Sequence, residues 1–212
     1  MIKERFSSQV EGFILRRAEF LTRVPLTPDQ LTLVGVGISG IAALAYALAA
    51  VKVAGYLLIA AGVADLIDGV IARKRGMASP AGAFFDSTMD RVSDLLIFSG
   101  IAVGVANTGS GWGTALVCWA LSGTVLTSYT RARAEAQLRE FSVGLMERAE
   151  RFVVLIGFSL FDQLTWALWI IALGSTATSV QRILTARRML RDASSGSHLR
   201  LVSDKDFEAA DV

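Results

Sequence analysis

Long apolar stretches alternate with short basic segments along this chain, and the lengths of the apolar stretches predict membrane-spanning helices. An α-helix needs about 20 mostly apolar residues to cross the hydrocarbon core of a bilayer. Stretches of this kind without any charged side chain are found at 31–51, 112–130 and 163–181. Charge-interrupted apolar stretches are found at 53–72 and 83–106, and a short one at 152–161 extends backward as a helix to residue 147. We therefore expect an all-α integral membrane protein with six transmembrane helices.

The distribution of basic residues predicts how these six spans are oriented. Of the 21 Lys and Arg residues, 19 lie before the first span, between spans two and three, between spans four and five, or after span six. These four segments lie on one side of a six-span protein, and the positive-inside rule places that side in the cytoplasm. We expect both termini to be cytoplasmic and the protein to reside in the cell (plasma) membrane.

The two ends of the chain differ from the spans. Residues 1–29 form a juxtamembrane segment with apolar side chains at helical spacing and arginines between them, which predicts an amphipathic helix on the inner leaflet. A solvated cap on the helical bundle is the alternative. Residues 192–212 are polar and end in an acidic run, so we expect a mobile tail after a membrane domain that spans residues 1–191, with six spans from about residue 30 onward. We expect membrane lipids as partners and no nucleic acid.

Carboxylates inside the predicted spans carry the candidate chemistry, because ionisable residues at membrane depth are costly and indicate function. Asp65 and Asp68 are three residues apart and share one helix face, and Asp86 and Asp90 are four apart and share another. The pairs flank a short basic loop, so we expect them to face each other near the cytoplasmic ends of spans two and three. Divalent cations would relieve the repulsion among four carboxylates, and a site built of oxygen ligands favours Mg²⁺ or Mn²⁺.

The same carboxylates belong to one longer pattern, Asp65-x2-Asp68-Gly69-x2-Ala72-Arg73-x8-Gly82-x3-Asp86-x3-Asp90. With all eight fixed positions matched, the chain resembles the CDP-alcohol phosphotransferase family, and the six expected spans agree with that family. The resemblance implies an enzyme that transfers a phosphatidyl-type group from a CDP-linked lipid to an alcohol and releases CMP.

The resemblance also implies a role for each residue of the pattern. Asp65, Asp68 and Asp86 would bind metal, as two ions, with Asp90 as a further ligand or the general base. The segment 27–32 is similar to a motif that the family carries at the start of its first span, although family members often have Asn where this chain has Asp29. The CDP-lipid pocket would be formed by Pro28, Asp29, Thr32, Asp68, Gly69, Ala72, Arg73 and Gly82.

Two further segments bear on the acceptor alcohol. Residues 128–135 and 147–151 resemble the prokaryotic phosphatidylinositol-phosphate synthases, which join inositol 1-phosphate to CDP-diacylglycerol. The resemblance implies that Arg131, Arg151 and Arg182 bind the acceptor phosphate, with Arg131 standing where relatives commonly carry Lys. It also implies a homodimer.

Three alternatives stay open at this point. Glycerol 3-phosphate could be the acceptor, which would make the chain a phosphatidylglycerophosphate synthase, or CDP-archaeol could be the donor, as in an archaetidylinositol-phosphate synthase. A cation-coupled transporter is the alternative of a different class. Transporters place such charges near the membrane midplane in interrupted, internally repeated helices. The charges here lie near the span ends, and the sequence contains no such repeat.

Overall fold

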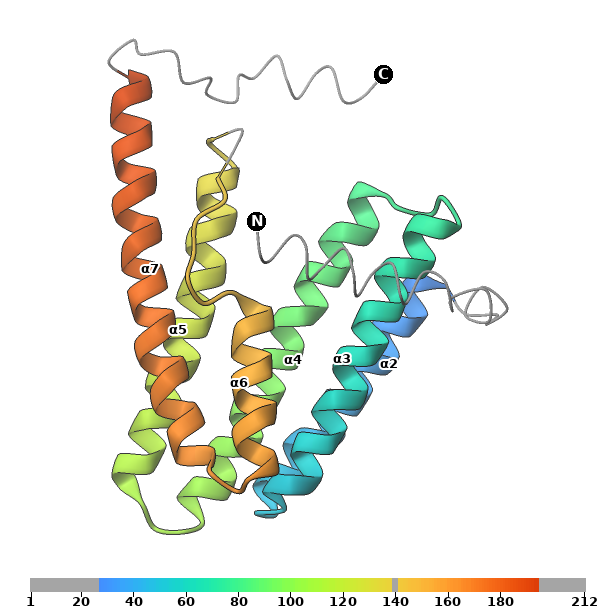
Figure 1. Cartoon of the computed structure of the whole chain (residues 1–212), viewed down its shortest axis with the longest axis vertical. Coiled ribbons are helices and arrows are strands. Elements are labelled where there is room, and N and C mark those ends of the chain that lie inside the picture. Colours follow the sequence, from blue (N-terminus) through green and yellow to red (C-terminus); the bar gives the residue numbers. More distant parts are fainter. Residues whose placement is uncertain (1–26, 139–140, 195–212) are drawn as a thin grey trace. The chain divides into compact units, whose positions relative to one another are not determined.

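A computed structural model of the chain describes residues 27–138 and 141–194, which are largely helical (Figure 1). The helices of this part are α2 (Pro28–Ala47), α3 (Val51–Lys74), α4 (Pro80–Ala106), α5 (Gly111–Glu135), α6 (Arg148–Leu160) and α7 (Leu164–Ser194). The chain divides into two compact units, Met1–Val105 with α2, α3 and most of α4, and Ala106–Val212 with α5, α6 and α7. The predicted juxtamembrane helix lies outside the described residues apart from its last three, as does the predicted tail from residue 195 onward.

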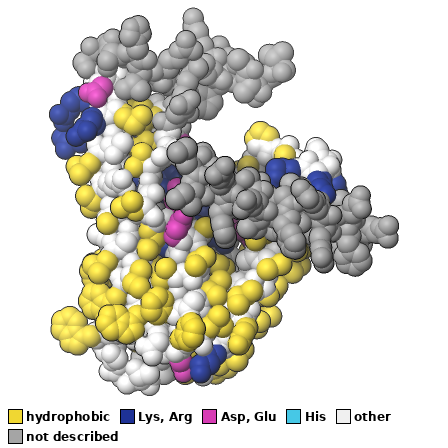
Figure 2. Space-filling view, in the orientation of Figure 1, with side chains coloured by type: hydrophobic (Ala, Val, Ile, Leu, Met, Phe, Trp, Pro, Cys, Tyr) yellow, Lys and Arg dark blue, Asp and Glu magenta, His cyan; other side chains and the backbone are white. Residues whose placement is uncertain are grey.

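Three of the described helices are long and apolar enough to cross a membrane, namely α2, α3 and the portion Leu164–Ala193 of α7. The helical fold that the sequence predicts is therefore confirmed, whereas the number of six spans stays a prediction. Large apolar side chains lie exposed along α7 (Figure 2), among them Trp169, Leu173 and Val180. Such a surface suits contact with lipid chains better than contact with water.

The helices α2 and α4 both begin with well-formed caps. The Thr27 hydroxyl accepts a hydrogen bond of 3.3 Å from the Gln30 N–H, and the Gln30 side chain accepts one of 3.0 Å from the Thr27 N–H. At α4, the Ser79 hydroxyl accepts a 3.1 Å hydrogen bond from the Gly82 N–H. Each cap is followed by a proline, whose missing N–H would have no helical partner at that position. The caps fix where these two helices start.

In the first unit, α2 packs along α3, and glycines of α4 allow a close contact with α2. A Cβ added to Gly100 would overlap the carbonyl group of Ala43, and one added to Gly104 would overlap that of Tyr46. Small residues of this kind let helix backbones approach closely where lipid gives little driving force for association. The two glycines therefore set the position of α4 against α2.

Two helix ends differ from those that the apolar stretches predict. The first stretch runs to residue 51, but α2 ends at Ala47, and Ala49 turns the chain with a φ of 59° before α3 begins. No glycine or proline marks this turn, so the sequence carries no signal for it. The last stretch ends at residue 181, whereas α7 continues to Ser194 and includes Arg182. The last turns of α7 mix basic and apolar residues, so no uninterrupted apolar stretch in the sequence marks where this helix ends.

In the second unit, α7 packs against both α5 and α6, and hydroxyl groups join α5 to α7. The Thr127 hydroxyl lies 2.9 Å from that of Ser179 and 3.1 Å from the Ser175 carbonyl oxygen. The Trp119 indole N–H donates a 3.0 Å hydrogen bond to the Thr176 hydroxyl. These bonds fix the register of the two helices, which carry Arg131 (α5) and Arg182 (α7).

Candidate functional site

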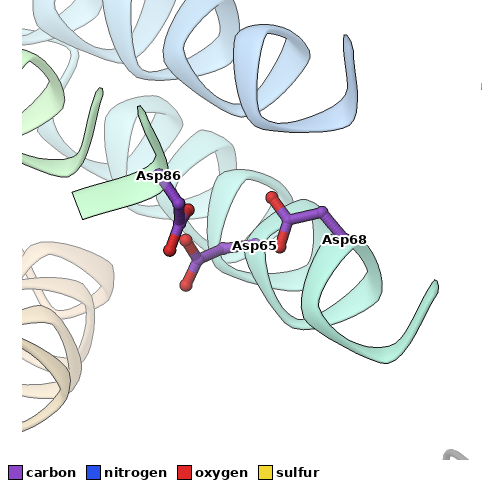
Figure 3. A group of neighbouring side chains, drawn as sticks. All are labelled: Asp65, Asp68 and Asp86. Atoms are coloured by element: carbon purple, nitrogen blue, oxygen red, sulfur yellow. The ribbon is translucent and has the colours of Figure 1, made fainter. Parts of the chain in front are cut away.

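Three carboxylates converge where α3 and α4 approach their connecting loop (Figure 3). Asp65 and Asp68 come from α3 and Asp86 comes from α4, and one carboxylate oxygen of each lies within 4.8 Å of the others. Asp68 is buried, and the other two are half-buried. Such concentrated negative charge suits a hard divalent cation, which prefers oxygen ligands. The donor set thus fits Mg²⁺ or Mn²⁺.

The hydroxyl of Thr32 on α2 donates a hydrogen bond of 2.9 Å to Oδ2 of Asp68. The same hydroxyl lies 3.2 Å from the Pro28 carbonyl oxygen, but it has one proton, and the shorter contact is with the carboxylate. Both side chains are buried. Because one oxygen of Asp68 is fixed in this way, the orientation of the whole carboxylate is fixed too.

Asp90 lies one helical turn beyond Asp86 on α4, and the cluster of three carboxylates does not include it. Its Oδ2 is 3.5 Å from Nη1 of Arg91, and its side chain is 16% exposed. It shares a helix face with Asp86, as the spacing predicts. Its role as a ligand or general base stays a prediction.

A pocket of about 420 Å³ lies beside the carboxylates in the first unit. Its volume is in the range of small-molecule sites. Its lining includes every residue that the sequence assigns to the CDP-lipid, namely Pro28, Asp29, Thr32, Asp68, Gly69, Ala72, Arg73 and Gly82. Asp86 lines it as well, so the pocket and the three carboxylates share a wall. The N-termini of α2 and α4 both reach this pocket, and helix N-termini attract anions.

Two glycines keep this pocket open. A Cβ on Gly82 would lie 3.3 Å from the Ser79 hydroxyl oxygen and 4.0 Å from Oδ1 of Asp29. A Cβ on Gly69 would lie 3.6 Å from Nη1 of Arg73, so the guanidinium of that arginine folds back over Gly69. Arg73 is the one cationic side chain among the described residues of the pocket lining. The arrangement offers a positive group and bare backbone to an anionic, flat ligand.

Sequence reasoning missed part of the lining. Thr27, Met77, Ala78, Ser79 and Ala83 also face the pocket. Ser79 had a signal, since a serine directly before a proline is a typical helix start. Thr27 had the same signal, since it directly precedes Pro28, and it belongs to the segment 27–32 that resembles the family motif. Met77 and Ala78 carry no such signal, because the loop between α3 and α4 takes its path from the packing of those helices.

The three arginines predicted for the acceptor phosphate all lie in the second unit. The guanidinium of Arg182 is 3% exposed and donates hydrogen bonds to the Val143 carbonyl at 2.6 Å and the Thr127 carbonyl at 2.7 Å. Arg151 is also buried and donates one of 3.3 Å to the Met146 carbonyl. Both arginines thus hold the connection between α5 and α6 while keeping their positive charge in the interior.

Two glutamates that the sequence reasoning did not single out accompany these arginines. Nε of Arg131 donates a hydrogen bond of 2.7 Å to Oε1 of Glu135, one turn further along α5. That bond raises the pKa of the Arg131 guanidinium above its ordinary value, so this arginine stays charged. Oε1 of Glu147 lies 3.8 Å from Nη1 of Arg131 and 3.6 Å from Nη2 of Arg182. One carboxylate therefore lies between two of the three predicted phosphate ligands.

Comparison with known protein families shows which family contains this combination of aspartates, pocket and arginines. The family model for CDP-alcohol phosphatidyltransferases matches residues 25–186, which include the aspartate cluster, the pocket and the arginines. The chain belongs to the CDP-alcohol phosphatidyltransferase family. The sequence resemblance is thereby confirmed, and the chain is an enzyme of this class. Family and apolar helices together indicate an integral membrane protein.

Curated CDP-alcohol phosphatidyltransferases resemble the chain over most of its length. It is 39% identical over 193 residues to the phosphatidylinositol phosphate synthase of Streptomyces avermitilis, covering 83% of this chain and 78% of that protein. It is 34% identical over 181 residues to the archaetidylinositol phosphate synthase of Pyrococcus horikoshii, covering 82% of this chain and 91% of that protein. Both relatives are named for inositol phosphate products with different lipids.

A solved structure of the family also resembles the chain. The phosphatidylinositol phosphate synthase of Mycobacterium tuberculosis with CDP-DAG bound is 29% identical, with a TM-score of 0.72, and the match covers 84% of this chain and 94% of that one. The same enzyme has been solved in complex with manganese and citrate, with a TM-score of 0.73 and 30% identity over 81% of this chain and 87% of that one. Manganese in that relative and the aspartate cluster here together indicate a divalent-metal enzyme.

Proposed function

We propose that this chain transfers the phosphatidyl group of CDP-diacylglycerol to a hydroxyl of inositol 1-phosphate, giving phosphatidylinositol phosphate and CMP. The observation that carries this proposal is the 420 Å³ pocket, which is lined by all eight predicted donor residues. One of these, Asp68, belongs to the aspartate cluster, and a second member of the cluster, Asp86, lines the pocket as well. The names of the bacterial relatives support inositol phosphate as the acceptor.

We place this reaction at the cytoplasmic face of the plasma membrane. The distribution of Lys and Arg supports six spans with both termini in the cytoplasm, and residues 1–191 form the membrane domain, followed by a tail over 192–212. At that face the donor's lipid chains stay in the bilayer, while the soluble acceptor arrives from the cytoplasm. Membrane lipids surround the spans, and the family supports a homodimer.

The donor's diphosphate lies in the pocket, between the N-termini of α2 and α4. Arg73 contributes a guanidinium that can bind phosphate oxygens in a bidentate manner. Gly69 and Gly82 leave the space in which the cytidine approaches the backbone. Asp65, Asp68 and Asp86 would hold Mg²⁺ or Mn²⁺, and we propose two ions, with Asp90 as a further ligand or the general base. A divalent cation bound there neutralises charge that develops on the phosphates during transfer.

Asp90 acts as the general base in this proposal. Its carboxylate takes the proton of the acceptor hydroxyl, and the freed oxygen attacks the lipid-side phosphorus in line with the bond to CMP. The new phosphorus–oxygen bond forms as the bond to CMP breaks, and the electron pair leaves on the CMP phosphate. The position of Asp90 one turn from Asp86 supports this role, since it lies next to the cluster without belonging to it.

Arg131, Arg151 and Arg182 bind the acceptor phosphate. A buried guanidinium such as that of Arg182 pairs strongly with a phosphate because water does not screen it. Such a cluster has no use with serine or free inositol as acceptor. It would also accept glycerol 3-phosphate, so the arginines support a phosphorylated acceptor and the relatives' names support inositol.

A second candidate keeps the acceptor and changes the lipid. The Pyrococcus horikoshii relative is named an archaetidylinositol phosphate synthase, and the match covers 91% of it. This likeness favours CDP-archaeol as an alternative donor. Lipid chains lie in the bilayer and contact few specific groups, so both donors fit the same pocket residues.

The proposal is tested by measuring CMP release from the purified full chain with Mg²⁺. CDP-diacylglycerol and CDP-archaeol are each combined with inositol 1-phosphate, free inositol, glycerol 3-phosphate or serine. We expect turnover with inositol 1-phosphate and CDP-diacylglycerol, and none with free inositol or serine. Turnover with glycerol 3-phosphate alone would overturn the acceptor, and turnover with CDP-archaeol alone would overturn the donor.

A further inference from the structure

The carboxylate of Glu147 lies where two of the predicted phosphate ligands meet. Its Oε1 is 3.8 Å from Nη1 of Arg131 and 3.6 Å from Nη2 of Arg182. The Glu147 side chain is 30% exposed, whereas that of Arg182 is 3% exposed. A single half-buried anion thus lies between one cation that solvent reaches and one that it does not.

Both contacts with Glu147 are loose compared with the other bonds of the same arginines. A charge-assisted hydrogen bond usually measures about 2.7–2.9 Å. Arg131 makes one of 2.7 Å with Glu135, and Arg182 makes bonds of 2.6 and 2.7 Å with carbonyl oxygens. Each guanidinium is therefore oriented by shorter bonds to partners other than Glu147.

The start of α6 places Glu147 at this position. Glu147 is the N-cap residue of α6 and forms a capping box with Glu150, whose side chain accepts a 3.0 Å hydrogen bond from the Glu147 N–H. Close by, a Cβ on Gly144 would lie 2.7 Å from Nη2 of Arg182, so the loop passes tightly over the guanidinium. The loop and the helix cap together bring the Glu147 carboxylate to 3.6 Å from Arg182.

Building on the proposed function, we infer that Glu147 is a specificity-determining residue whose carboxylate occupies the anion position between Arg131 and Arg182 until the acceptor phosphate displaces it. A phosphate has three oxygens and up to two negative charges, so it can contact both guanidiniums at once. A carboxylate held at 3.6 and 3.8 Å competes weakly with it. A neutral hydroxyl cannot displace Glu147, so the site admits phosphorylated acceptors and rejects their unphosphorylated counterparts.

The test compares three variants of the full chain. Glu147→Gln removes the competing charge and keeps an oxygen for the helix cap. Glu147→Asp withdraws the carboxylate by one methylene, and Asp is itself among the best N-cap residues, so α6 stays capped if Gln disturbs it. Asp162→Asn is the control, because it removes one negative charge at the turn between α6 and α7, and Asn suits the φ of 61° there.

Inorganic phosphate is titrated into each purified protein by calorimetry at constant pH and ionic strength. We expect Glu147→Gln to lower the Kd of phosphate by about fivefold, the combined effect of two partly exposed ion pairs. Glu147→Asp should shift the Kd in the same direction, and Asp162→Asn should change it by less than about twofold. The KM for inositol 1-phosphate should fall in parallel, with little change in kcat.

An unchanged or raised Kd in both Glu147 variants would overturn the inference, as would an equal effect of Asp162→Asn. Failure of the proposed function looks different. If the wild-type chain turns over no phosphorylated acceptor, the proposed function fails, while the phosphate titration still decides the role of Glu147. If the chain uses inositol 1-phosphate and the Kd does not move, Glu147 only caps α6.

Discussion

The Thr32 hydroxyl on α2 holds Oδ2 of Asp68 on α3 through a hydrogen bond of 2.9 Å between two buried side chains. The bond joins the helix that begins at the pocket to the helix that carries two of the three clustered carboxylates. Thr32 therefore lines the pocket and also orients one of these carboxylates.

We expect Thr32→Val to weaken metal activation, because the Asp68 carboxylate loses the donor that orients it. Loss of a hydrogen bond behind a metal ligand typically costs about 10–100-fold in metal affinity or activity. The Mg²⁺ concentration for half-maximal CMP release should rise accordingly, and Thr32→Ser should restore it. Thr114→Val is the control, since that hydroxyl bonds only the Ser110 carbonyl, at 3.1 Å. Equal metal activation in Thr32→Val and wild type would contradict this role.

We expect Gly82→Ala to impair donor binding. The added Cβ would lie 3.3 Å from the Ser79 hydroxyl oxygen and would intrude on the pocket between that group and Asp29. The KM for CDP-diacylglycerol should rise by roughly tenfold, the effect of about 1.4 kcal/mol. The KM for the acceptor should stay the same. Gly157→Ala on α6, with nothing within 4 Å of the added Cβ, should leave both KM values near those of the wild type. A rise only in the KM for the acceptor would contradict the assignment of this pocket to the donor.

We expect Gly100→Ala to destabilise the fold. A Cβ there overlaps the Ala43 carbonyl, so α4 must move away from α2. Overpacking of this kind costs about 1–3 kcal/mol. The midpoint of thermal unfolding in detergent should fall clearly, whereas Gly37→Ala on α2, with nothing within 4 Å of the added Cβ, should not lower it. An unchanged midpoint for Gly100→Ala would show that the two helices are not held this closely.

Much of the fold and of the site follows from the sequence because helical periodicity is local. The three-residue spacing of Asp65 and Asp68 puts them on one face, and the short loop after α3 brings Asp86 back to them. These features depend on neighbours within a few turns, which a single sequence displays.

Other features depend on which helices meet, and the sequence does not display that. The hydrogen bond from Thr32 to Asp68 joins residues 36 positions apart. The position of Glu147 between Arg131 and Arg182 depends on the path of the loop before α6. The turn at Ala49 has no glycine or proline to mark it. Packing of α2 against α3 instead supports a backbone conformation there that alanine seldom adopts.

We expect the clustered aspartates and the adjoining pocket to form the catalytic centre. The decisive experiment is CMP release from CDP-diacylglycerol by Asp68→Asn, measured with inositol 1-phosphate across a range of Mg²⁺ concentrations. Asp162→Asn is the control. It makes the same chemical change at the turn between α6 and α7, where the φ of 61° suits Asn as well as Asp. We expect Asp68→Asn to release CMP on the order of 100-fold more slowly than the wild type, or slower still. Asp162→Asn should keep the wild-type rate. A rate for Asp68→Asn within about twofold of wild type, at the same Mg²⁺ requirement, would show that the clustered aspartates are not the catalytic centre.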